Sequence, residues 1–228
     1  MKSRLVSLLL AGVVLLSGCA TPQAPVSMSA QAFGTTGKNY GVLMTTMPVV
    51  DTQFPGAGCL LCIAAASMAN SDLTKHAKTL PSDDLAKLDT QLGEVLRKRG
   101  VAVTMVPSFD LKTLPDSAKG APAFSKKDFS SLKAKYKIDK LLVVELGAVG
   151  FQRTYSAYFP TSEPKAYVGG AVYIVNLNDN SLEWYKPLAV LRAADGKWDE
   201  PPKYPGLTNA YYQSIELARD EVLKPLVQ

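Results

Sequence analysis

The segment Cys59-Leu60-Leu61-Cys62 holds the side chains best suited to covalent chemistry. Two cysteines three positions apart on a helix lie on one face, so a disulfide between them is feasible. The segment follows a predicted strand and a glycine-bearing loop and opens a predicted helix, and the positive end of a helix lowers the pKa of a thiol. This setting is typical of a thiol–disulfide oxidoreductase.

Two other interpretations of Cys59 and Cys62 stay open: a structural disulfide and a pair of buried free thiols. The two leucines between the cysteines are more apolar than usual in redox pairs, and the flanking apolar run predicts burial. If the chain is exported to an oxidising compartment, a possible structural disulfide is the favoured interpretation.

His76 is the only histidine of the chain. With Cys59 and Cys62 it would supply three zinc ligands, whereas a closed structural site has four. We therefore predict no metal site and a polar surface histidine. No serine lies in a G-x-S-x-G elbow, and we predict that the protein is not an enzyme, has no catalytic residues and binds no cofactor.

Glu145 interrupts an apolar strand. We expect it to face the other side of the sheet or to pair with Arg153 or Arg192. Aromatic side chains on two long neighbouring strands leave open a membrane-inserting hairpin of an oligomeric pore. These are Phe151, Tyr155, Tyr158, Phe159, Tyr167 and Tyr173. A soluble sheet packed on helices is the simpler interpretation.

The amino terminus has the pattern of a secretory signal. Lys2 and Arg4 precede an apolar run from Leu5 to Leu16, which is shorter than the ~20 residues of a spanning helix. Leu16-Ser17-Gly18-Cys19 then resembles the lipobox of bacterial lipoproteins. The resemblance implies cleavage before Cys19, a diacylglycerol (with its palmitate-type chains) on the sulfur and an acyl group on the new amino terminus.

The lipobox resemblance also predicts the location. Two or more acyl chains make a stable membrane anchor where one does not. Because Ala20 rather than aspartate follows Cys19, the family rule favours the outer membrane, with the domain facing the periplasm. We predict a signal peptide over residues 1–18, a flexible lipidated tether over 19–39, rich in Thr, Pro, Ser and Gly, and an α/β domain over 40–228.

Charge and hydropathy limit the function classes. Of the 25 Lys and Arg residues, Lys2 and Arg4 belong to the signal, and the remainder barely exceeds the 20 acidic residues. Such a balance predicts no nucleic-acid partner. A hydrophobic content of 47% is ample for a core, and no segment after the signal predicts a spanning helix.

Periodicity predicts the order β-α-β-α-β-β-β-α, with an extra short buried helix after the first strand. The expected strands cover 40–50, 101–106, 141–159, 167–177 and 182–192, with the third one long and extended. The expected helices cover 59–69, 82–100, 125–136 and 207–222. Together they predict one mixed sheet with helices on one face.

This order resembles a periplasmic α/β module. The module is shared by the TolB amino-terminal domain, the curli secretion lipoprotein and the lipoprotein activators of penicillin-binding proteins. The residues that carry the resemblance are the strand from Asp139 to Leu146 and the strand–turn–strand from Ala171 to Trp184. Segment 51–80 departs from the module, which does not require it.

The resemblance implies a non-enzymatic accessory or scaffold lipoprotein of the cell envelope. Such proteins bind another envelope protein or form homo-oligomers. The alternatives are a subunit of an oligomeric secretion channel, like the curli lipoprotein, and a periplasmic oxidoreductase that uses Cys59 and Cys62.

Overall fold

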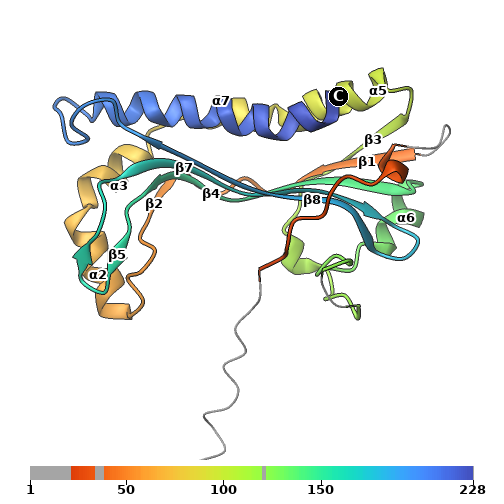
Figure 1. The fold of residues 1–228 in the computed structure, drawn as a ribbon, viewed down its shortest axis with the longest axis horizontal. Helices are drawn as coiled ribbons and strands as arrows, with labels where there is room; N and C mark the ends of the chain where they lie inside the picture. Colours follow the sequence, from red (N-terminus) through yellow and green to blue (C-terminus); the bar gives the residue numbers. More distant parts are fainter. Residues whose placement is uncertain (1–21, 34–38, 120–121, 228) are drawn as a thin grey trace, which may run out of the picture.

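The computed structural model of the protein describes residues 22–33, 39–119 and 122–227. Its framework is a six-stranded mixed sheet with the order β3-β1-β4-β7-β8 and with β2 paired to one end of β4 (Figure 1). The strands are β1 (Asn39–Met44), β2 (Asp51–Gln53), β3 (Ala102–Val106), β4 (Lys140–Gln152), β7 (Lys165–Asn176) and β8 (Ser181–Ala193). β1 is parallel to β3 and β4, whereas β7 is antiparallel to β4 and β8. The predicted mixed sheet packed by helices is confirmed.

The helices largely follow the predicted order. They are α2 (Leu60–Ala69), α3 (Ser71–Ala77), α4 (Asp83–Ala86), α5 (Leu88–Lys98), α6 (Ser130–Tyr136) and α7 (Pro205–Val227), with short 3-10 turns η1 (Ala30–Ala32) and η2 (Leu111–Thr113). The helix expected over 82–100 is divided at Lys87, but its apolar stripe is confirmed, since Leu85, Leu88 and Leu92 are fully buried. No described helix is long and apolar enough to cross a membrane.

Both faces of β4 are buried. Leu142 and Val144 belong to the core under α5 and α7, whereas Leu141 and Val143 belong to a second core with α6 and η2. Alternate residues of a strand point to opposite faces of the sheet, which explains the continuous apolar run. The expectation of helices on one face only is therefore wrong, because α6 covers the other face (Figure 1).

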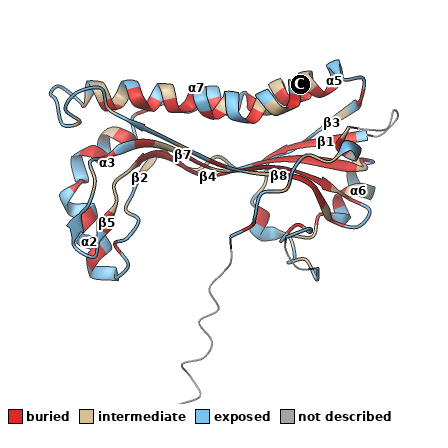
Figure 2. Ribbon diagram, in the orientation of Figure 1, coloured by how far each residue is buried: buried red, intermediate tan, exposed pale blue. Residues whose placement is uncertain are grey.

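α7 is the main cover of the first face. Its buried side is the predicted stripe of Leu207, Tyr211, Ile215, Ala218 and Val222. The helix begins at Pro205, whose fixed φ suits a first helical position. Figure 2 shows this buried side turned toward the sheet and the opposite side exposed.

Two strands end earlier than predicted. The first expected strand stops at Met44, and the chain rejoins the sheet as β2, beside the far end of β4. The long extended segment stops at Gln152, and a small hairpin of β5 (Tyr155–Ser156) and β6 (Phe159–Pro160) follows. The hairpin lies beside α2 rather than in the main sheet (Figure 1).

We call residues 54–70 and 154–161 the arm. They form a small cluster of their own, in which Phe54, Cys62 and Tyr155 pack together apart from the two large cores. The expected burial of the short helix is wrong, since only Cys62 and Ala66 of α2 are buried (Figure 2). A ten-residue helix at the end of the sheet has only one side in contact with the protein.

Candidate functional site

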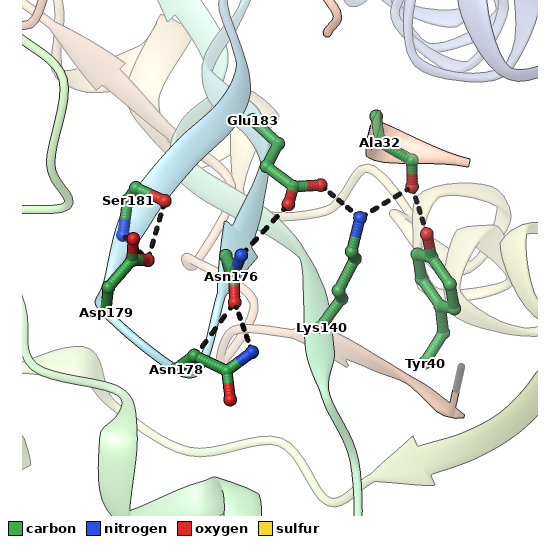
Figure 3. Close-up of polar contacts among 8 residues, drawn as sticks. All are labelled: Ala32, Tyr40, Lys140, Asn176, Asn178, Asp179, Ser181 and Glu183. Carbon is green, nitrogen blue, oxygen red and sulfur yellow. Dashed lines mark hydrogen bonds and ion pairs between the residues drawn. The ribbon is translucent and has the colours of Figure 1, made fainter. Parts of the chain in front are cut away.

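A buried ion pair links β4 and β8. Lys140 Nζ donates to Glu183 Oε2 at 2.5 Å, and the two side chains are 1% and 9% exposed (Figure 3). Asn176 donates to the other oxygen of Glu183 at 3.2 Å. Burial, with the negative charge of Glu183 beside it, raises the pKa of Tyr40. Both members of the ion pair make further hydrogen bonds, Lys140 to the carbonyl of Ala32 and Glu183 to Asn176. Such bonds are needed to offset the cost of removing two charges from water.

The same pair holds the amino-terminal segment on the sheet. The carbonyl of Ala32 accepts hydrogen bonds from Lys140 Nζ and from the Tyr40 hydroxyl (Figure 3). Val26 pairs with Tyr185 of β8 through both backbone bonds. Residues 22–33 therefore differ from the flexible tether predicted over 19–39, because backbone pairing and the buried Ala32 fix them. Cys19 and the signal, residues 1–18, lie outside the described residues.

A groove of about 860 Å³ separates the arm and α3 from β4 and β7. Gly147, Gly169 and Gly170 line its floor, at a bulge of β4 between Leu146 and Ala148. A Cβ on Gly170 would lie 2.0 Å from the carbonyl oxygen of Glu145, so the strands can approach only with glycine there. The backbone of Gly147 is exposed and that of Gly170 half-buried, whereas Gly169 is buried under the Tyr167 hydroxyl.

The surface of the groove is mostly apolar in area and carries little charge. Asp51 and Lys78 are the charged residues of the lining, and they pair with each other at 3.6 Å. The uncharged lining comprises the polar or aromatic residues Thr52, Gln53, Phe54, Ser67, Ser71, Thr74, Gln152 and Tyr167, together with the apolar Pro55, Ala57, Ile63 and Ala148. This mixed composition suits an uncharged ligand with both apolar and hydrogen-bonding groups, such as an extended polypeptide.

Two threonines of this lining have unused hydrogen-bonding capacity. The Oγ1 atoms of Thr52 and Thr74 are buried and make no hydrogen bond to any residue that the structure describes. Thr52 as a whole is 8% exposed. An unpaired buried hydroxyl costs about 1–3 kcal/mol. Four other buried side-chain atoms of the described residues also lack a hydrogen-bond partner, so the two threonines do not by themselves mark a ligand site.

The structure joins Cys59 and Cys62 in a disulfide at the start of α2. Cys59 is the N-cap, and its Sγ accepts a hydrogen bond from the backbone N–H of Cys62 at 2.9 Å. Cys59 is exposed and Cys62 is 3% exposed. The expectation that both cysteines are buried is wrong for Cys59, which is the exposed N-cap residue of the helix.

His76 packs away from the cysteine pair. Its ring stacks on Phe151, and its Nε2 lies 2.7 Å from the hydroxyl oxygen of Thr208. Burial lowers the pKa of His76, and the positive charge of Lys203 lowers it further. Within the described ranges no three His, Cys, Asp or Glu side chains are grouped to hold a metal ion.

Glu145 takes a partner that the sequence did not suggest. It is exposed and accepts a hydrogen bond from the Tyr173 hydroxyl at 3.1 Å. Burial raises the pKa of Tyr173, and the charge of Glu145 adds to this effect. The expected pairing with arginine is wrong: Arg153 donates to Asn70 and Arg192 to Gln213.

Comparison with known proteins gives distant structural likenesses only. No family model and no curated protein matches the chain. The PelC dodecamer from Paraburkholderia phytofirmans is 11% identical, with 89% of this chain and 94% of that chain covered and a TM-score of 0.34. A neuraminyllactose-binding hemagglutinin homolog from Helicobacter pylori is 10% identical, with 90% and 94% covered and a TM-score of 0.32. At these scores the likenesses carry no argument about this chain.

The sequence indicates the cysteine pair as a candidate site but does not predict the groove. Thr52 and Thr74 are ordinary residues in the sequence, and they meet only because β2 and α3 pack side by side at the end of β4. Glycines are the sequence feature that could have indicated the groove. Gly147, Gly150 and the Gly169-Gly170 pair interrupt long apolar strands. Such interruptions mark bulges and close approaches.

Proposed function

We propose that this protein is a lipoprotein of the outer membrane, anchored through lipid on Cys19, whose domain faces the periplasm. There it acts as a non-enzymatic accessory or scaffold that binds another component of the cell envelope. The anchor rests on the lipobox Leu16-Ser17-Gly18-Cys19. The binding role rests on the groove between the arm and the sheet.

The observation that carries the binding role is the open groove of about 860 Å³ between the arm, α3 and the sheet. Exposed polar side chains such as Gln53 and Ser67 line it and can hydrogen-bond to a ligand. The paired charges of Asp51 and Lys78 leave the groove without net charge. We therefore expect an uncharged extended segment of an envelope protein as the partner.

Site-specific photo-crosslinking in intact envelopes tests this proposal. A photoreactive amino acid replaces Ser67, which lines the groove, or Glu216, which is exposed on α7 as the control. We expect a discrete crosslinked envelope protein from position 67 and none from position 216. Equal products from both positions, or none from position 67, would contradict a partner in the groove.

A hydroxyl-to-methyl variant sharpens the same experiment. Thr52→Val keeps the shape of the side chain and removes an unpaired hydroxyl, so the unfolding free energy should stay equal or rise. The crosslink from position 67 should stay unchanged, because the protein covers the Thr52 Oγ1 atom and a ligand in the groove does not reach it. A crosslink that weakens severalfold would show that the groove opens around Thr52 when a partner binds.

A thiol–disulfide oxidoreductase is the second candidate. The exposed Cys59 at the start of α2, with Cys62 buried behind it, favours this function because a helix start lowers a thiol pKa. Insulin reduction tests it, with Cys59→Ser as the control variant. Turnover that depends on Cys59 would support the enzyme, and its absence would remove it.

A further inference from the structure

The outer side of α2 is apolar and has no partner among the described residues. Leu60 is 88% exposed, Leu61 is 71% exposed and Met68 is 79% exposed. The intervening outer positions are the exposed Ala64 and Ala65. Positions i, i+1, i+4, i+5 and i+8 of a helix lie on one side, so these residues form one continuous apolar face.

The small hairpin extends this face. Tyr158 and Phe159 are 49% and 74% exposed, and the Tyr158 hydroxyl lies 3.8 Å from Cys59 Sγ at the start of α2. No residue of the arm, in either 54–70 or 154–161, is Asp, Glu, Lys, Arg or His. The outer face of α2 and the hairpin therefore form a continuous exposed apolar surface without a charged side chain. Such a surface marks an interaction site.

The direction of the arm indicates what covers it. In Figure 1 the arm and the first described residues both extend from the sheet on the side opposite α7. The described chain begins at Pro22, three residues after Cys19, a span of at most about 10 Å. Lipid on Cys19 would therefore hold the arm's side of the domain, and not α7, against the bilayer.

The length of α2 suits a helix that lies at the surface of a bilayer rather than one that spans it. An apolar helix of ten residues is too short to span a bilayer, and one that is not buried in a core can be an interfacial segment. Most of its backbone hydrogen bonds are made within the helix, and the unpaired N–H groups of its first turn can stay at the headgroup level, where water reaches them. Tyrosine at the edge is favoured at the headgroup level.

We propose that the arm is a second membrane contact. The outer face of α2, with Tyr158 and Phe159, enters the phospholipid leaflet that carries the lipid of Cys19. This inference rests on the proposed lipid anchor. Together the two contacts would fix the orientation of the sheet and direct the groove, which lies behind α2, along the membrane surface.

Fluorescence quenching by brominated phospholipids tests the contact. The full chain, produced with its lipid and reconstituted in phosphatidylethanolamine–phosphatidylglycerol vesicles, carries Leu61→Trp in the arm or Leu217→Trp on α7 as the matched control. Both leucines are exposed, and α7, which bears Leu217, lies on the side of the sheet away from the arm. The emission of the parent protein, which contains Trp184 and Trp198, is subtracted from that of each variant. We expect bromine on the acyl chains to quench Trp at position 61 at least about twofold more than at position 217, as burial of an interfacial face requires.

Vesicle flotation separates the two proposals. If the protein floats with the vesicles but position 61 is quenched no more than position 217, the arm contact is overturned while the anchor stands. Crosslinks between copies through position 61, without quenching, would assign the face to a second copy and equally overturn it. If the protein fails to float, the anchor itself is wrong and the inference falls with it.

Discussion

At the scale of single residues, Lys140 and Glu183 have the largest predicted effect on stability. Lys140→Met leaves a buried carboxylate without its cation, which costs about 3–5 kcal/mol in the free energy of unfolding. Urea denaturation of the variant measures this loss. The double variant Lys140→Met/Glu183→Met should recover most of it, because two packed apolar side chains replace a desolvated pair. A single variant as stable as the parent would contradict this account.

His76 gives the protein a dependence on pH near neutrality. Its pKa in the folded state lies below the ordinary value, so the unfolded chain binds the proton more readily. The unfolding free energy should therefore fall as the pH drops below about 6.5, the ordinary pKa of histidine. Because His76 is the only histidine, His76→Gln should flatten the slope between pH 7.5 and 5.5. Equal slopes for both proteins would refute the assignment.

At the scale of elements, Gly150 controls how β2 and the arm join the sheet. It has a φ of +134°, and a Cβ there would lie 2.1 Å from the carbonyl oxygen of Asp51. Gly150→Ala should therefore lower the unfolding free energy by about 2–3 kcal/mol and expose the arm to chymotrypsin. Gly147→Ala is the control, since its Cβ would meet only the carbonyl oxygen of Gly169 at 3.9 Å. Comparable losses in both variants would contradict a specific role for Gly150.

The long elements could be predicted because their periodicity is unambiguous. β7 is a long apolar run that ends at a cluster of turn residues, β8 returns from that turn, and α7 has a helical stripe; the structure confirms all three. The composition of α2 predicted a helix but not its surroundings, because an apolar sequence is equally typical of a core and of a contact surface. Residues 22–33 have the composition of a linker and are ordered only by long-range bonds, such as that from Lys140 to Ala32.

At the scale of the whole molecule, residues 22–33, the arm and the groove are held by one sheet. The Lys140–Glu183 pair joins Ala32 of this segment to the sheet that bears the groove. If lipid on Cys19 anchors the chain, as we propose, a partner bound in the groove would be held near the bilayer.

Metabolic labelling with palmitate tests the proposed lipid on Cys19 in a single measurement. The full chain should incorporate the label and sediment with the outer membrane, because two or more acyl chains anchor stably. Cys19→Ser should abolish the label and move the protein to the soluble fraction. An unlabelled parent protein, or a Cys19→Ser variant with an unchanged distribution, would contradict the account.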